Sequence, residues 1–318
     1  MTRVSDQRGP RPSAENGILP PVVRALVFVL VWPGVAFASS AGAIQLFCPG
    51  GARSACSGAA YNYAAVAGEC LATVILAFGF RRFLDRRPAD SLGLSLGVNS
   101  LRLFALGAAF GAGMQTLAFV LEYVTGSVHV AAIAPIRTDL TSWAAILPLL
   151  AIAALAEELP LRGYLFQNLR VVWGNAFAIA GTSLLFALLH VTNPGAHQDF
   201  ALTIIGVALA GAWFCAAVIW TRSLWLALGA HISWNLFEGS VFGLPVSGLT
   251  LGNGSAITSA VGGPTWFTGG SFGPEAGVSS LVALSVGAVA LYVLHRRGAL
   301  SFASASSVDV FAGDAAGD

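Results

Sequence analysis

Residues 142–169 read SWAAILPLLAIAALAEELPLRGYLFQNL, an apolar run long enough to cross a bilayer. The run carries two adjacent carboxylates, Glu157 and Glu158, followed by Arg162. A charged side chain at the centre of a spanning helix costs about 2.5–3.5 kcal/mol on insertion scales, so it needs a partner or a function. The stretch therefore predicts a membrane helix that carries polar chemistry in its interior.

The composition extends this prediction to the whole chain. The 318 residues are 56% hydrophobic and 10% charged, and the mean hydropathy is +0.76. Soluble domains carry about 25% charged residues. The charged residues of this chain are therefore too few to cover a water-facing surface. No alternation typical of a membrane β-barrel is visible. We expect an all-α polytopic membrane protein whose partners are lipids, and the net charge of +1 gives no reason to expect nucleic acid.

The apolar runs predict about eight transmembrane helices, joined mostly by short connections. We expect a flexible tail at 1–20, a transmembrane domain at 21–298 with its motif-bearing core at 140–243, and a disordered tail at 299–318. Small residues four apart, Gly107 and Gly111, are suited to close helix packing in lipid. The predicted helices are 22–47, 61–80, 101–125, 142–169, 176–191, 200–220, 224–243 and 279–295.

Arginine placement predicts the orientation, because cytoplasmic loops of membrane proteins are enriched in basic residues. Most arginines fall on one side if both termini lie in the cytoplasm, and we expect the bacterial plasma membrane. Residues 244–278, rich in Gly, Ser and Thr, then form an outer connection that is mobile or partly re-entrant. Cys48 and Cys56 flank a short polar loop, where a disulfide is possible outside the cytoplasm.

The carboxylates differ in their local partners. Glu158 and Arg162 are four residues apart and share a helix face, so they can form an ion pair. Glu157 is rotated by about 100° and cannot share that geometry. A buried carboxylate without a cation in its own helix is the usual form of a general base.

Two histidines on later helices are candidate partners for Glu157. His190 follows an apolar run, and His231 shares a helix face with Asn235, four residues on. A single histidine on an apolar face is more often a hydrogen-bonded core residue. A turn near Trp173-Gly174 would bring His190 to the depth of Glu157, although a simple hydropathy drawing places His190 at the opposite end of its helix. We expect these groups to converge in one cavity.

In this order and on separate helices, the three motifs resemble those of the CAAX-protease and bacteriocin-processing family. The motifs are Glu157-Glu158-x-x-x-Arg162, Phe186-x-x-x-His190 and His231-x-x-x-Asn235, and every motif position is present. The resemblance covers about residues 140–243.

The resemblance implies hydrolysis of a peptide bond within the membrane, in a membrane-associated or lipidated peptide or protein. It implies that Glu157 activates water with help from His190, and that His231 and Asn235 stabilise the oxyanion. Glu158 and Arg162 would brace the site. Family members are usually described as metalloproteases, and Glu157, His190 and His231 could hold Zn²⁺. A Glu-activated water without metal is equally compatible with these residues.

Two other functions use the same residue types. Intramembrane Glu and His build ion pathways in transporters and proton relays. Transporters often carry such residues in repeated halves, whereas the polar residues here lie in the second half of the chain. A catalytically inactive binding or immunity protein on the same scaffold would keep the helices without the reaction.

Overall fold

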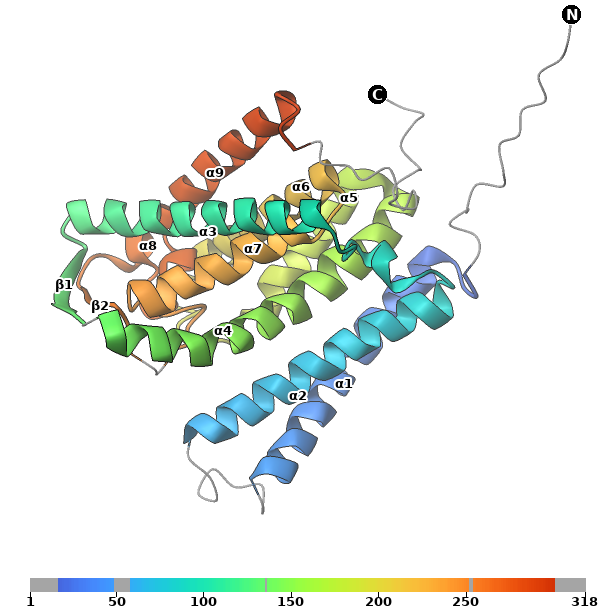
Figure 1. The fold of residues 1–318 in the computed structure, drawn as a ribbon, viewed down its shortest axis with the longest axis horizontal. Coiled ribbons are helices and arrows are strands. Elements are labelled where there is room, and N and C mark those ends of the chain that lie inside the picture. Colours follow the sequence, from blue (N-terminus) through green and yellow to red (C-terminus); the bar gives the residue numbers. More distant parts are fainter. Residues whose placement is uncertain (1–16, 49–57, 135, 252–253, 301–318) are drawn as a thin grey trace, which may run out of the picture.

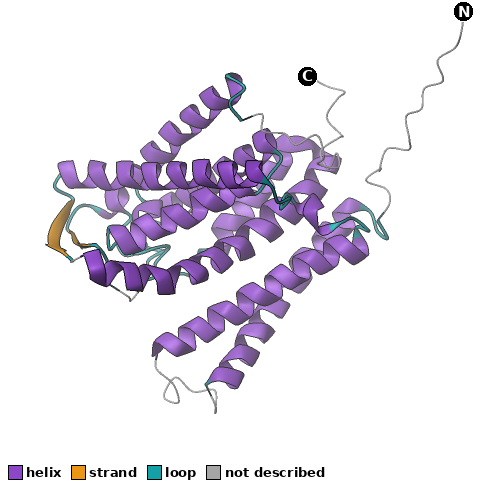
Figure 2. Ribbon diagram, viewed as in Figure 1, coloured by secondary structure: helices purple, strands orange, loops and turns teal. Residues whose placement is uncertain are grey.

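The computed structural model describes residues 17–48, 58–134, 136–251 and 254–300, with side chains described from 63 and from 146 onward in the second and third ranges. Within these ranges the protein is helical apart from one pair of short strands (Figure 2). The predicted all-α membrane fold is confirmed in its main features. The predicted tails at 1–20 and 299–318 lie largely outside the described residues and stay predictions.

The helices form a bundle with a two-helix arm, α1 and α2, packed along its side (Figure 1). Three π-helical segments, two 3-10 turns and the strands β1 and β2 complete the described elements. The α-helices are α1 (Pro21–Phe47), α2 (Gly58–Gly79), α3 (Val98–Val124), α4 (Ile136–Glu158), α5 (Phe166–Leu189), α6 (Phe200–Thr221), α7 (Trp225–Asn235), α8 (Thr265–Thr268) and α9 (Val278–Arg296). The π-segments are η2 (Phe80–Leu84), η4 (Leu159–Leu165) and η5 (Leu236–Val241), the 3-10 turns are η3 (Ala89–Leu92) and η6 (Pro274–Ala276), and the strands are β1 (Val128–Ile133) and β2 (Ile257–Val261).

Six helical spans in the described residues are long and apolar enough to cross a membrane, compared with about eight predicted. The difference has two causes. The predicted helices 142–169 and 176–191 lie in one span of 44 residues, Ile146–Leu189. The predicted helix 224–243 is α7 followed by η5, and α7 alone has 11 residues, which is too short to cross.

A break at Gly174 folds the long span back on itself. Gly174 has φ 77 and ψ 174 inside α5, a left-handed conformation that ends the helical path. Arg162 and Phe186 each lie 12 residues from this break, and the Arg162 guanidinium carbon is 4.5 Å from the centre of the Phe186 ring. The two halves are therefore antiparallel neighbours, as the predicted turn near Trp173-Gly174 requires.

Two of the π-helical segments begin directly after a polar residue of a sequence motif. η4 begins at Leu159, immediately after Glu158, and η5 begins at Leu236, immediately after Asn235. Short π-segments inside helices occur frequently at functional sites, because the wider turn changes the direction of the side chains that follow. The change of pitch thus begins directly after Glu158 in one helix and directly after Asn235 in the other, and Arg162 lies within η4.

Residues 244–278, predicted to be a mobile or partly re-entrant connection, contain regular structure. They contain β2, which pairs antiparallel with β1 from Val128↔Val261 to Ile133↔Ile257, and also α8 and η6. η6 packs against α6 and α9, so this connection lies over the bundle rather than away from it. The pairing joins segments far apart in sequence, which local composition does not reveal.

Close packing of α3 against α7 confirms the interpretation of Gly107 and Gly111. A Cβ atom on Gly107 would collide with the Leu226 carbonyl oxygen, and one on Gly111 with the Ala230 carbonyl oxygen. Backbones this close occur where small residues line a helix interface in lipid. Since α7 carries His231 and Asn235, this interface fixes the position of the third motif.

We expect Gly111→Ala to lower stability by about 1–3 kcal/mol, because the added methyl group overpacks the α3–α7 interface. Gly113→Ala is the matched control, since Gly113 lies on the same helix with nothing within 4 Å of its Cβ position. Thermal unfolding of the two purified variants in one detergent measures the difference. Equal melting temperatures would contradict the close contact.

Candidate active site

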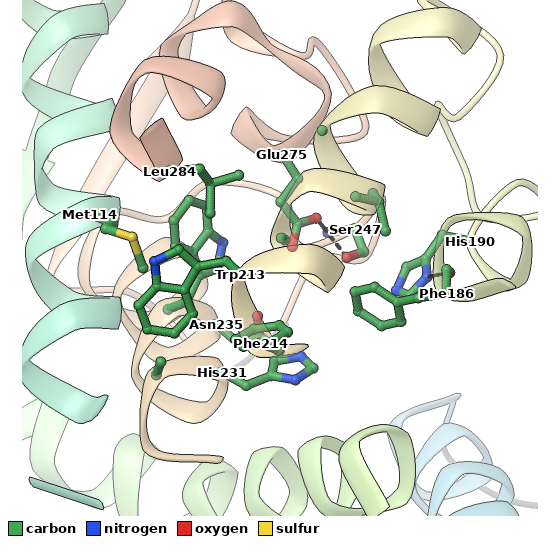
Figure 3. A pocket seen from close by; sticks show the side chains of 15 residues that line it. Met114, Phe186, His190, Trp213, Phe214, His231, Asn235, Ser247, Glu275 and Leu284 are labelled. Atoms are coloured by element: carbon green, nitrogen blue, oxygen red, sulfur yellow. Dashed lines mark hydrogen bonds between the residues drawn. The ribbon is translucent and has the colours of Figure 1, made fainter. Parts of the chain in front are cut away.

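A pocket with about 530 Å³ of empty space brings two of the motifs together (Figure 3). Its walls come from α3, α5, α6, α7, η6 and α9, and the polar groups of the second and third motifs face it. The lining residues are Met114, Phe186, His190, Gly206, Val207, Ala210, Trp213, Phe214, Ala230, His231, Trp234, Asn235, Ser247, Glu275 and Leu284.

The first motif meets the third through Glu158. Glu158 Oε1 lies 3.0 Å from Arg162 Nη1 and 3.1 Å from His231 Nδ1. The side chains of Glu158 and Arg162 are fully buried. The predicted Glu158–Arg162 pair is therefore present, and His231 is an additional partner that the sequence did not indicate. A carboxylate only accepts hydrogen bonds, so the His231 proton at Nδ1 points to Glu158.

Aromatic rings enclose the Arg162 guanidinium. Its carbon lies 4.5 Å from the centre of the Phe186 ring and 5.3 Å from that of Phe214. Gly211 of α6 leaves the room for it, because a Cβ there would come 2.8 Å from Arg162 Nη2. Rings of this kind stabilise a desolvated cation, which adds to the ion pair with Glu158.

Glu157 has a different environment from its neighbour. Its side chain is 35% exposed, and its Oε2 lies 3.6 Å from His231 Nε2. That distance is too long for a direct hydrogen bond. Glu157 Oε2 has no hydrogen-bond partner among the described residues. His231 thus stands between the two carboxylates, one bound to its Nδ1 and the other near its Nε2 but free to bind a further group.

His190 and Asn235 lie in the wall of the same pocket as His231 (Figure 3). The His190 Nδ1 is 2.8 Å from the Phe186 carbonyl oxygen, which fixes a proton at Nδ1 and leaves Nε2 as an acceptor. In the described part of the chain, no residue hydrogen-bonds the Asn235 amide. Both groups therefore keep hydrogen-bonding capacity for a bound molecule. His190 lines the same pocket as His231 but, among the described residues, forms no hydrogen bond or ion pair with Glu157. The predicted convergence of the three groups is therefore closer for His231 than for His190.

The connection 244–278 adds two residues that sequence analysis missed. Ser247 donates to Glu275 Oε2 from its backbone N–H at 2.8 Å and from its hydroxyl at 2.6 Å, and both residues face the pocket (Figure 3). Burial raises the pKa of the Glu275 carboxyl, while the Ser247 hydrogen bonds and the charges of His190 and His231 act against that shift. No described residue donates to Glu275 Oε1. In the sequence, Glu275 stands in the tripeptide Gly273-Pro274-Glu275. That pattern indicates a turn and gives no sign of a functional carboxylate.

The proposed zinc ligands do not form a metal-binding group. Among the described residues, no set of three or more His, Cys, Asp or Glu side chains is arranged to hold a metal ion. Glu157 and His231 lie close together, but His190 contacts neither and is turned by its bond to the Phe186 carbonyl.

Comparison with known proteins identifies one family. Residues 139–237 match the family model described as type II CAAX prenyl endopeptidase Rce1-like. The match spans roughly a third of the chain and includes all seven residues named in the three motifs. No curated protein and no solved structure matches the chain. The resemblance inferred from the motifs is confirmed for this segment.

We expect Arg162→Ala to lower the melting temperature and the folded yield, because it leaves the buried Glu158 without its cation. Removing one member of a buried pair costs about 3–5 kcal/mol. The control is Arg82→Ala, which removes an exposed arginine that forms no ion pair in the described residues. Thermal unfolding in detergent measures both, and wild-type stability of Arg162→Ala would contradict the bracing role.

Proposed function

We propose that the Rce1-like segment at residues 139–237 makes this membrane protein an intramembrane endopeptidase of the CAAX-protease type. The family match supports a protease. The site geometry supports different roles for the two adjacent carboxylates, with Glu157 as the general base and Glu158 as a structural partner. The observation that carries the proposal is the contrast between two adjacent carboxylates. Glu158 is fully buried and paired twice, whereas Glu157 is partly exposed and has an oxygen free beside His231.

In the proposed reaction, Glu157 is the general base. Its carboxylate takes a proton from a water molecule, and the oxygen of that water attacks the carbonyl carbon of the scissile peptide bond. His190 Nε2 accepts the second hydrogen of the water and orients it. The C–N bond then breaks, and the proton held by Glu157 passes to the leaving amine. Water is thereby divided between the two new peptide ends.

The negative charge that develops on the carbonyl oxygen needs donors in place before the reaction. The Asn235 amide supplies N–H groups and is not engaged elsewhere in the described residues. His231 supplies a second donor when protonated, because Glu158 holds its Nδ1 proton and Nε2 then carries the other. Glu158 and Arg162 fix the His231 ring and leave the oxyanion contact to Nε2.

The proposed substrate class rests on the surroundings of the site. The pocket walls are mainly apolar, with Phe186, Trp213, Phe214 and Leu284 beside the polar groups. Such walls favour a peptide that reaches the site from the bilayer, as a membrane-associated or lipidated segment. The sequence is also compatible with bound zinc, with an inactive binding or immunity role and with a transport role. Cleavage by the wild type and by Glu157→Gln distinguishes the protease from the last two.

We expect Glu157→Gln to lower cleavage by at least about 10²-fold, the lower end of the usual contribution of a general base. The change keeps the size of the side chain, so the melting temperature should stay close to that of the wild type. Proteomics of newly formed peptide termini in membranes with wild-type or variant protein measures cleavage. Glu122→Gln is the control, because it removes a buried carboxylate of α3 that does not line the pocket.

The outcomes separate the candidate functions. New termini that depend on Glu157 and persist in Glu122→Gln support the protease. Equal cleavage by Glu157→Gln would show that the base is wrongly assigned. An identical set of termini with and without the wild-type protein would favour an inactive or transporting protein.

We also propose that the end of the bundle containing η2 faces the cytoplasm. This end carries Arg82 and Arg86, and it meets the α6–α7 turn where Leu224 N–H donates to the Gly93 carbonyl oxygen. Cys48, after α1 at the opposite end of that helix, is disulfide-bonded, which supports an oxidising compartment there. Cys56, its predicted partner, lies outside the described residues.

Cysteine labelling in intact cells tests this orientation. A cysteine at Arg86, which is exposed, should react with a membrane-impermeant maleimide only after permeabilisation. A cysteine at Ile133 of β1, 76% exposed and beyond the far end of α3, should react in intact cells. The reverse pattern would contradict the proposed orientation.

A further inference from the structure

A second polar pocket lies away from the candidate active site, where α1 begins and α2 ends. It holds about 230 Å³ of empty space. The described residues around it include three guanidiniums and one carboxylate, which gives a net charge of +2. They are Pro21, Arg24, Arg81, Asp85, Arg87, Gln167, Asn168 and Val171.

The single carboxylate is fully engaged. Asp85 Oδ1 accepts from Arg24 Nη1 at 2.8 Å and from the Tyr164 hydroxyl at 3.2 Å, and Asp85 Oδ2 accepts from Arg81 Nη1 at 2.8 Å. Arg87 therefore finds no ion-pair partner in the described part of the chain. Burial lowers the pKa of the Arg87 guanidinium and the charge of Asp85 acts against that shift, so an anion bound beside Arg87 would offset the cost of burial.

Gln167 supplies an independent observation. Its side chain is buried, with 6% of the residue exposed, and Arg81 Nη2 donates to its Oε1. Because a guanidinium only donates, the carboxamide atom that contacts Arg81 must be the oxygen. The amide nitrogen, Nε2, therefore points away from Arg81. Gln167 Nε2 is buried without an acceptor in the described residues. An unsatisfied buried donor costs about 1–3 kcal/mol, and a bound acceptor would remove this cost.

The backbone adds to the positive potential. α1 has 27 residues and begins at Pro21, which lines the pocket, so the positive end of this helix lies beside it. A helix N-terminus favours phosphate and other anions. The pocket also lies where two apolar spans, Pro21–Phe47 and Tyr63–Leu84, reach their ends. Lipid phosphates lie at that depth in a bilayer.

We propose that this pocket binds a phosphate group, carried either by an anionic phospholipid headgroup or by a free phosphate. Arg87 supplies the charge, Gln167 Nε2 donates a hydrogen bond, and the N-terminal end of α1 adds positive potential. Arg24 and Arg81 shape the site around Asp85 and raise the local potential. This site is separate from the peptidase proposal and does not depend on it.

The test uses the purified full chain in a neutral detergent, with melting temperature and titrated affinity as readouts. One arm adds inorganic phosphate against chloride at equal ionic strength. The other adds phosphatidylglycerol against phosphatidylcholine, whose phosphate is compensated by its own choline. We expect the wild type to bind phosphatidylglycerol at least about tenfold more tightly than phosphatidylcholine, because the choline cation cancels the negative charge that Arg87 would neutralise; tenfold corresponds to about 1.4 kcal/mol.

Two variants and one control make the test specific. Arg87→Gln should weaken anion binding at least about tenfold, because it removes the uncompensated charge. Gln167→Glu should abolish binding while preserving the fold, since the new carboxylate still accepts from Arg81 and repels the phosphate. Arg86→Gln is the control, because Arg86 is exposed, has φ 54 and does not line the pocket.

Each result either supports or overturns the site. A response to phosphatidylglycerol alone identifies the lipid headgroup, and a response to inorganic phosphate as well shows that the phosphate is sufficient. Equal weakening by Arg86→Gln and Arg87→Gln would show diffuse surface attraction and overturn the pocket. Wild-type binding by Gln167→Glu, or no binding of either ligand by the wild type, would also overturn it.

Discussion

The contact of His231 with Glu158 is the interaction on which the candidate site depends. It joins α7 to α4 through atoms 3.1 Å apart, and Arg162 neutralises the same carboxylate from one turn away. In lipid no water compensates a buried charge, so these groups must satisfy one another inside the protein. The pairing fixes one nitrogen of the imidazole and directs the other toward Glu157. This one polar contact therefore joins α7 to α4 and orients the imidazole of the candidate site.

Helical irregularity places these groups where regular helices would not. The π-helical segments η4 and η5 begin directly after Glu158 and Asn235, and Gly174 reverses the chain between the first two motifs. The wider π-turn rotates the residues that follow Glu158 and Asn235 relative to those that precede them. Arg162 lies within η4 and can thus contact both Glu158 and the Phe186 ring of the returning helix.

Sequence predicted the features that depend on local spacing. The Glu158–Arg162 pair follows from two residues four apart, and the reversal at Gly174 follows from a glycine between apolar runs. The contact of His231 with Glu158 could not be predicted, because it depends on how two distant helices pack. Glu275 was missed because it lies in a glycine-rich turn without periodicity, and only the folding of that connection over the bundle brings it to the pocket.

The two polar regions of the protein meet on one short segment. Tyr164, two residues after Arg162 in η4, donates to Asp85, which binds the arginines of the first two helices. The rings of Phe28 and Phe80 enclose Tyr164, with centroids 4.8 and 5.8 Å from its own. The α1–α2 arm thus contacts the π-segment that carries the brace of the candidate site. The α1–α2 arm lies outside the family match, yet it constrains the geometry of the first motif. It does so because Arg162 of the candidate site and Tyr164, which contacts the arm, lie in the same segment, η4.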